Sequence, residues 1–441
     1  MQKFAFVIIC VAMLFEFTLT TFHLPPLLRF VPEAISGLVL VYVLIAGTQD
    51  GFRWVATKYW VILGALALVV ICGIISNDPS PGALITGMRF YFRAAPLFLL
   101  GAVLPMTDEQ LLRQLKLLLV LAFCQLPVAV YQRWIIISAD RFSGDDVRGT
   151  LMDSGILSML LICGALILTG LVLKRRIGVW RYGLLFILLL IPTTINETKV
   201  TVVFLPLGLF VVMLVGADPG KRLRYTGLGF AALVVFAAIF VPIYDKMESL
   251  NGSSVSIVDF FTTEKNLDKY LVSEGSGRGV GVGGKKHAHR GEAIVVPVTY
   301  LAKDPVLLAF GLGLGNASPS QSGPAYEGRY YSLFQNILEI SFAAFLLELG
   351  VFGVLAIIAL NWMIFTDSVA VARRDTGLVG AIAAGWTGVV AIFMVATLYN
   401  NFHLFTSVTF LYWYFAGIVC ARRMALRYET VGARYANVQY A

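Results

Sequence analysis

The chain has 441 residues, of which 58% are hydrophobic and 14% are charged. A soluble domain does not have this composition, so most of the chain must be shielded from water. The formal net charge is +8, but the basic residues are dispersed at the ends of apolar segments, where membrane topology places them, rather than gathered for nucleic acid.

Long apolar segments recur along almost the whole sequence. A helix needs about 20 apolar residues to cross the hydrocarbon layer, and the runs are continuous rather than alternating, which excludes a membrane β-barrel. The fold class predicted is an all-α polytopic membrane protein with about twelve transmembrane helices. The predicted spans are 4-21, 27-47, 58-76, 82-104, 109-137, 151-173, 179-196, 199-216, 225-243, 350-366, 377-399 and 402-421.

The first of these segments resembles a signal peptide, with Lys3 followed by an apolar run. Glu16 interrupts that run and no small-residue cleavage site follows, so we expect a retained first helix. All five cysteines lie inside apolar segments, and no disulfide framework is predicted.

Basic clusters occupy alternate connections between the predicted spans. The positive-inside rule assigns these connections and both termini to the cytoplasm. The clusters are Arg53 and Lys58; Arg113 and Lys116; Lys174, Arg175, Arg176 and Arg181; Lys221, Arg222 and Arg224; Arg373 and Arg374; and Arg422, Arg423 and Arg427.

The opposite, periplasmic side then carries one large loop, 244-349. It separates helices one to nine (1-243) from helices ten to twelve (350-421), which precede a cytoplasmic tail (422-441). Within the loop, 257-272 and 291-309 are predicted as short helices at the membrane surface. The apolar segment 331-347 is predicted to be interfacial or re-entrant, with Gly350 and Gly353 marking the bend into the next crossing.

Arg89 and Arg93 are the clearest functional candidates inside a predicted span. They lie in GMRFYFRAAP, one helical turn apart on one face. An ionisable group in a membrane helix is costly, and two stacked guanidinium groups suit a phosphate. The alternative is a structural pairing with Glu16 or Glu33.

Two short outer connections also carry charge. Arg148 opens RGTLMDSG at the start of a helix, an arrangement that suits an anion but also fits a capped helix with a solvated arginine. Glu197 and Lys199 form a second cluster, either a substrate contact or a simple ion pair at the rim.

Two other patterns point to no cofactor. His287 and His289 lack a spaced third ligand for a metal. The series Gly311, Gly313 and Gly315 lacks the strand, helix and spacing of a dinucleotide loop.

Taken together, RGTLMDSG, Arg290 with DPVLLAFGLGLGN, and SLFQNILEISFAAFLLELGVFG resemble the signatures of the bacterial O-antigen polymerase and ligase superfamily. The resemblance implies a fold similar to the C-type glycosyltransferase architecture. It also implies action on undecaprenyl-diphosphate-linked sugars at the periplasmic face, without metal or nucleotide.

The resemblance assigns diphosphate binding to Arg148 and Arg290. The ligase branch has a histidine before the asparagine of the late helix, whereas this chain has Gln335 before Asn336, and glutamine does not titrate. The general base is therefore left open among Glu339, Glu327 and His289.

The sequence thus favours a polymerase of lipid-linked oligosaccharide repeat units, with Arg329, Asn336 and Tyr331 as further substrate contacts. Tyrosines here could also form an interfacial aromatic belt. The alternatives are a ligase that transfers glycan to a lipid core, and a transporter of anionic lipid or polysaccharide. Expected partners are the lipid-linked oligosaccharide, membrane lipids, a flippase and a chain-length regulator; nucleic acid is not expected.

Overall fold

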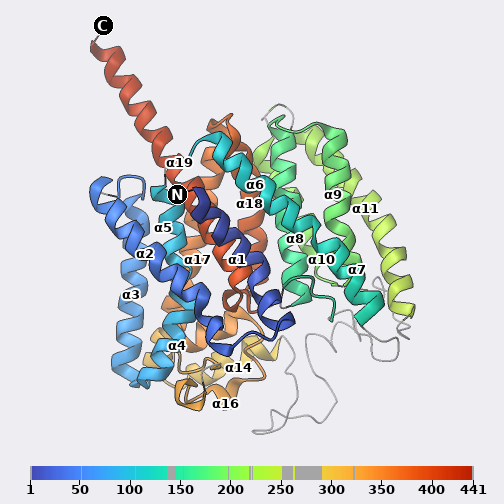
Figure 1. Ribbon diagram of the computed structural model, residues 1–441. Helices are drawn as coiled ribbons and strands as arrows, with labels where there is room; N and C mark the ends of the chain where they lie inside the picture. Colours follow the sequence, from blue (N-terminus) through green and yellow to red (C-terminus); the bar gives the residue numbers. More distant parts are fainter. Residues whose placement is uncertain are drawn as a thin grey trace.

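The computed structural model is a bundle of helices with a small cap of short helices and turns at one end (Figure 1). The structure describes residues 2–50, 52–104, 106–136, 146–151, 153–196, 198–217, 220, 222–250, 262–263, 291–320 and 323–439. Every secondary-structure element in these ranges is helical, so the predicted all-α class is confirmed.

The first half of the chain supplies the helices up to α11. They are α1 (Gln2–Thr21), η1 (Pro26–Phe30), α2 (Val31–Asp50), α3 (Thr57–Asn77), α4 (Pro81–Phe92), α5 (Ala95–Val103), α6 (Asp108–Phe123), α7 (Gln125–Tyr131), η2 (Gln132–Ile136), α8 (Ser154–Leu173), α9 (Val179–Ile195), α10 (Thr201–Gly216) and α11 (Arg222–Leu250).

The second half supplies the cap and the last long helices. The cap contains α14 (Glu292–Leu301), α15 (Pro305–Phe310), η6 (Pro324–Tyr326) and α16 (Tyr331–Phe334), and it is followed by α17 (Ser341–Arg374), α18 (Leu378–Ala396), η7 (Phe402–Leu404) and α19 (Thr406–Gln439).

Local sequence signals set several helix ends. The Ser80 hydroxyl accepts a hydrogen bond from the amide of Ala83, and Pro81 follows at the first helical position, where its missing N–H costs nothing. Thr107 and Gln110 form a reciprocal capping box at the start of α6. These signals explain why the crossings begin where they do.

Eight candidate membrane-spanning segments, judged by length and composition, occur in the described residues. They begin at Phe4 and end at Ala396, and three shorter apolar helices accompany them. Each of the twelve predicted spans coincides with a helix or a run of consecutive helices. The protein is therefore a polytopic helical membrane protein, and the count of twelve crossings stays a prediction.

Several helices extend beyond the predicted spans. The helix that contains predicted 225-243 continues to Leu250, and the one that contains predicted 350-366 continues to Arg374. Predicted 402-421 begins at Thr406, after the turn η7. In the predicted surface segment 291-309 there are two helices, α14 and α15, because Asp304 caps a new helix that starts at Pro305. Most of predicted 257-272 lies outside the described residues.

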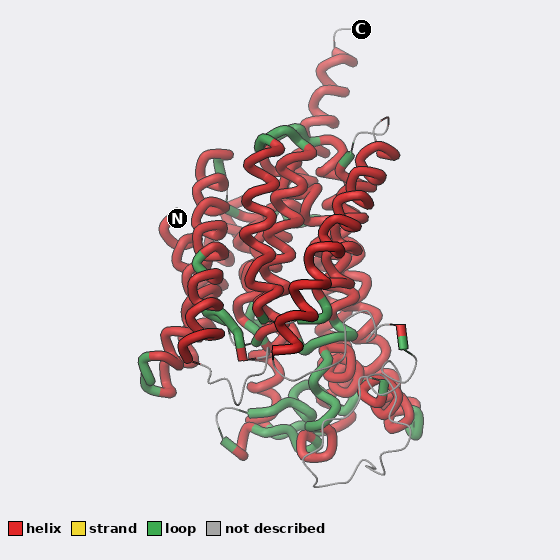
Figure 2. Tube along the Cα trace, turned by 90° about the vertical axis from the view of Figure 1, so that its right-hand side faces the viewer, coloured by secondary structure: helices red, strands yellow, loops and turns green. Residues whose placement is uncertain are grey.

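The two chain ends lie at the same end of the bundle, and the cap lies at the other (Figures 1 and 2). The central helix is α18, which packs against α8, α10 and α17. Small residues permit this: a side chain on Gly385 would lie 2.5 Å from the carbonyl oxygen of Leu166 on α8. Close approach of backbones at small residues is how helices associate in membranes.

A buried carboxylate is one of the contacts that hold the cap against the bundle, together with the hydrogen bonds from Thr86 to the Tyr326 carbonyl and from Asn77 to the Gly311 carbonyl. Glu348, on α17, is 1% exposed. Its oxygens accept hydrogen bonds from the amides of Gly315 and Ala317, both at 3.0 Å, and from the Ser318 hydroxyl at 2.8 Å. A buried charge is tolerated when it is hydrogen-bonded in this way.

The glycine series therefore has a structural explanation. Gly311, Gly313 and Gly315 have φ between 75° and 89°, a region that L side chains rarely adopt. A side chain on Gly315 would lie 1.8 Å from the carbonyl oxygen of Ala83 on α4. The three glycines let the loop turn tightly against the bundle while its amides face Glu348.

Gly350 makes the predicted bend. Its φ of 65° and ψ of −169° interrupt α17, so that 341–349 and 351–374 are two helical segments meeting at an angle. The predicted segment 331-347 is divided between α16, a run of turns and the first part of α17, and its interfacial or re-entrant placement stays a prediction.

We predict that Glu348→Gln detaches the cap. The amide would keep one acceptor but turn N–H groups toward backbone donors, and each buried unsatisfied group costs about 1–3 kcal/mol. Thermal unfolding in detergent should begin at a lower temperature, and limited proteolysis within 291–340 should be faster. Glu109→Gln is the control, because its ion pair with Arg113 is exposed and such pairs contribute little. Equal proteolysis of the two variants would contradict the assignment.

Candidate functional site

Arg89 and Arg93 lie at the cap end of the bundle, where α4 gives way to α5. Pro96 stands at the start of α5 and lacks the N–H that would continue the helical ladder. Arg93 is the last residue before this break. Its carbonyl oxygen accepts a hydrogen bond from the Ser36 hydroxyl of α2, so the break is held against a neighbouring helix.

Both arginines share one carboxylate oxygen. Arg89 Nε lies 2.6 Å from Glu33 Oε1, and Arg93 Nη1 lies 3.3 Å from the same atom. The side chains of Arg89, Arg93 and Glu33 are 13%, 6% and 20% exposed. Of the two acids considered from the sequence, Glu33 is the one that makes this contact.

This arrangement leaves hydrogen-bonding capacity unused. Within the described part of the chain, Glu33 Oε2 and Arg93 Nε are buried and have no hydrogen-bond partner. Buried polar atoms are normally paired, so each exception needs a reason. Glu16 on α1 and Arg29 add to the electrostatics of the group. The group therefore has three arginines to two carboxylates and suits an anion.

The loop before α8 is braced beside α1 and α7. The side-chain oxygen of Gln132 accepts from the amides of Arg148 and Gly149 at 3.0 and 2.8 Å. Thr150 donates from its amide to Gln125 Oε1 at 2.8 Å and from its hydroxyl to the Met13 carbonyl at 2.7 Å. Arg-Gly-Thr is thus a fixed turn, and the half-exposed Arg148 side chain projects from it, 3.5 Å from Asp146.

A chain of hydrogen bonds connects the start of α8 to the arginines. Asp153 caps α8 through the amide of Ile156 at 2.9 Å and accepts from the Asn400 side chain at 3.3 Å. The Asn400 carbonyl accepts the Ser341 hydroxyl at 2.9 Å.

The same chain continues through the turn before α19. His403 Nδ1 lies 3.0 Å from Ser341 Oγ, and since that hydroxyl donates to Asn400, the imidazole Nδ1 is the donor to it. The next carbonyl, of Leu404, accepts from Arg93 Nη2. We call the set Glu33, Arg89, Arg93, Asp153, Ser341, Asn400 and His403 the polar belt. It connects α2, α4, α8, α17 and the segment before α19 at the cap end.

The remaining predicted contacts lie on the cap. Arg329 is exposed, donates to the carbonyl of Asn77 on α3 at 3.2 Å, and stacks on Tyr330. Gln335 and Glu339 are exposed, and Tyr331 and Asn336 are partly buried. Gln335 donates within its own turn, to Ser332 at 3.5 Å.

Tyr331 is suited to donate a hydrogen bond. Burial raises the pKa of its hydroxyl, and Glu327 raises that pKa further, so the hydroxyl stays protonated at neutral pH.

Two predicted residues, Arg290 and Glu197, lie outside the described residues, as do His287 and His289. Lys199 lies in the turn before α10, at the cap end. The neighbouring Asn196 is buried and donates to the Ser154 carbonyl and hydroxyl of Ser158 at 2.9 Å each. This corner therefore fixes the end of α9 against the start of α8.

Sequence reasoning did not single out His403, Asn400 or the role of Glu348. A glutamate inside an apolar run was a usable signal for Glu348. The two polar residues before α19 had no such signal, because they stand in a turn where polar residues are ordinary.

No protein-family model matches the chain, and no curated protein is significantly similar to it in sequence.

We predict that Glu33→Gln makes the arginine pair dependent on added anion. Removing one partner of a buried ion pair costs about 3–5 kcal/mol, so the variant should unfold at a lower temperature in detergent. Millimolar pyrophosphate should restore more of the lost stability than it adds to the parent. Glu429→Gln, which breaks an exposed pair with Arg422, is the control and should gain nothing. A loss without recovery by pyrophosphate would mean that the group binds no diphosphate.

Proposed function

We propose that the protein is a membrane glycosyltransferase that polymerises polyprenyl-diphosphate-linked oligosaccharide repeat units at the cap side of the membrane. The donor is an undecaprenyl-diphosphate-linked glycan, and the product is a surface or exopolysaccharide. The membrane is the bacterial inner membrane, with the cap in the periplasm and both termini in the cytoplasm.

The observation that carries this proposal is the buried arginine pair with unused donors. Arg89 and Arg93 share a single carboxylate oxygen, and Arg93 Nε is unpaired within the described residues. Guanidinium groups bind phosphate oxygens with fixed geometry and remain charged when buried. A diphosphate near them would bind the donors that Glu33 leaves unused.

The chemistry follows from charge. In the transfer, an acceptor hydroxyl oxygen forms a bond to the anomeric carbon of the donor glycan while the bond from that carbon to the diphosphate oxygen breaks. The electron pair of the broken bond goes to the diphosphate, where the arginines neutralise it. The acceptor proton goes to a cap carboxylate, for which Glu339 and Glu327 are the candidates.

The surroundings of the pair support this assignment. Arg148 and Lys199 lie at the same end of the bundle. In the sequence, Arg290 comes two residues before the first cap helix, α14. Tyr331 adds a hydroxyl and a ring face for a sugar. Basic residues at the ends of alternate connections support the orientation.

Two alternatives are less well supported. A ligase would need a base where Gln335 stands, and an exposed amide cannot act as one. A transporter would bind its anion near the midplane with access from both sides, whereas the polar belt joins the cap end of α8 to the turn before α19.

The decisive experiment places the purified protein in lipid nanodiscs with a polyprenyl-diphosphate oligosaccharide. We expect a ladder of elongated glycans and released polyprenyl diphosphate. Arg93→Gln should slow elongation about 10²-fold or more, the loss typical for one donor to a developing anion. Arg290→Ala should also slow it.

Arg427→Gln, on the exposed surface of α19, is the matched control and should elongate at the parent rate. Absence of elongation by the folded parent, or parent-like rates in both arginine variants, would refute the enzyme. Movement of labelled donor between leaflets without a longer product would favour the transporter instead.

A further inference from the structure

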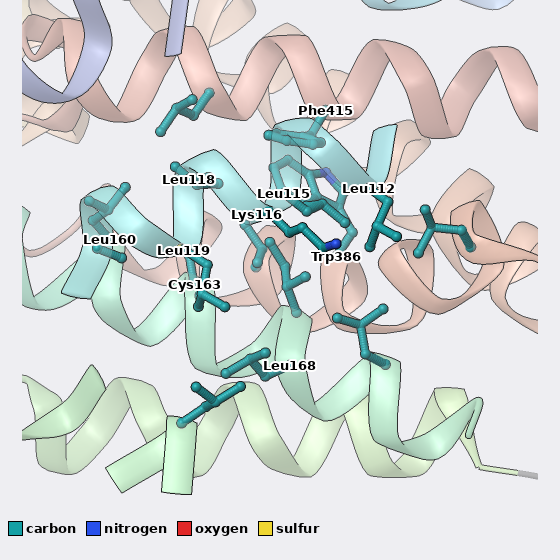
Figure 3. Close-up of a pocket in the computed structure, with 18 of the residues that line it drawn as sticks. Leu112, Leu115, Lys116, Leu118, Leu119, Leu160, Cys163, Leu168, Trp386 and Phe415 are labelled. Carbon is teal, nitrogen blue, oxygen red and sulfur yellow. The ribbon is translucent and has the colours of Figure 1, made fainter. Parts of the chain in front are cut away.

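A largely apolar cavity lies away from the polar belt and has no part in the proposed reaction. Its volume is about 510 Å³, and it lies between α6, α8, α18 and α19 (Figure 3). Leucines of α6 and α8 contribute to its wall, together with Trp386 of α18 and Phe415 of α19. We call this cavity the slot.

The slot runs from the termini end of the bundle toward the cap end. Asp108 and Arg176 line it at one extreme, and Met159, Phe393 and Val408 at the other. Asp108 begins α6, and Arg176 follows the end of α8. The charged lining residues are Asp108, Glu109, Lys116 and Arg176, all on the half nearer the termini, while the inner half is apolar.

The charges at the mouth leave a positive excess. Glu109 is paired with Arg113 at i,i+4, and Asp108 stands in the first turn of α6, where a negative charge complements the helix dipole. Lys116 has no ion-pair partner among the residues that the structure describes. Arg176 donates from Nη2 to the Thr376 carbonyl at 2.7 Å, which leaves its other donors for a ligand.

Trp386 gives an independent sign of a ligand. Its side chain is 3% exposed, and its indole Nε1 is buried without a hydrogen-bond partner in the described structure. Buried tryptophan N–H groups usually find a partner. Figure 3 shows the indole in the slot wall with Lys116 beside it, so a ligand held by the lysine would pass the indole.

We propose that the slot holds one anionic phospholipid of the bilayer leaflet on the termini side. One acyl chain fills the apolar half, the phosphate lies between Lys116 and Arg176, and an ester carbonyl below the phosphate accepts the Trp386 N–H. Basic side chains attract anionic lipids at this depth, and lysine and arginine reach toward the interface along apolar surface.

The position of the charge separates this lipid from the proposed substrate. The diphosphate of the substrate would lie at the polar belt, at the opposite end of the bundle. A peptide is a poor occupant as well, because the single donor of Trp386 cannot satisfy the many backbone N–H and C=O groups that a peptide would bring into the apolar part of the slot. The site is thus independent of the proposed transferase activity.

The test measures lipid retention by the full chain. The protein is purified in detergent, depleted of lipid, and incubated with mixed micelles of detergent and either phosphatidylglycerol or phosphatidylcholine. Bound lipid is then quantified by mass spectrometry after gel filtration. The parent should retain phosphatidylglycerol in preference and gain thermal stability from it.

Three variants separate the parts of the site. Lys116→Gln should retain about fivefold less phosphatidylglycerol, the loss expected for one basic side chain near an anionic lipid. Cys163→Phe should reduce retention of both lipids by filling the slot. Trp386→Phe keeps the ring and removes the donor, and should weaken retention without changing the preference for phosphatidylglycerol.

Arg373→Gln is the control, because Arg373 is an exposed basic residue at the same end that does not line the slot. It should behave as the parent. Equal retention of the two lipids by the parent, or unchanged retention in Lys116→Gln and Trp386→Phe, would overturn the proposal. So would displacement of the bound phospholipid by polyprenyl phosphate at equal concentration, since the slot would then belong to an isoprenoid.

Discussion

The buried carboxylate of Glu348 is the interaction on which the cap end of the molecule depends. A carboxylate in an apolar interior is stable only if its oxygens are hydrogen-bonded. Here the donors come from the loop between Gly315 and Ser318, so the charge and the loop fix each other. Because Glu348 stands just before the Gly350 bend, the same contact sets where the chain leaves the cap and enters the bundle.

The buried charges of the polar belt, unlike that of Glu348, are incompletely hydrogen-bonded. Each charge near the cap end must also be compensated, yet two guanidinium groups share one oxygen of Glu33, while Arg93 Nε and Glu33 Oε2 have no hydrogen-bond partner within the described residues. An ion pair with a purely structural role would be more stable if all its buried polar atoms were hydrogen-bonded, as the carboxylate oxygens of Glu348 are. At one end of the bundle, the Glu348 carboxylate has its hydrogen bonds, whereas the guanidinium groups of Arg89 and Arg93 share one carboxylate oxygen. This contrast is the physical reason for placing a ligand at the arginines.

Much of the fold followed from local pattern. Apolar runs predicted the helices because each crossing must satisfy its own backbone, and the bend at Gly350 followed from glycine chemistry. Arg89 and Arg93 stood out because charge is rare in such runs. Local pattern did not predict three of the contacts: the pairing of the arginines with Glu33 rather than Glu16, the bond from Asn400 to Asp153, and the contact of Glu348 with Gly315. They join residues 33 to 247 positions apart, and helix packing, rather than local pattern, decides which of them meet.

Aromatic side chains separate the slot from the residues nearer the cap. Phe393 lines the slot and also a smaller cavity of about 140 Å³ that reaches Tyr91, Ser341 and His403. Phe393 stacks on Tyr412 with ring centroids 4.0 Å apart, and aromatic pairs of this kind add stability beyond their buried area. Phe393 therefore lies between the slot and the smaller cavity that reaches His403. In the proposed arrangement, Phe393 would separate an acyl chain in the slot from a diphosphate bound at the polar belt.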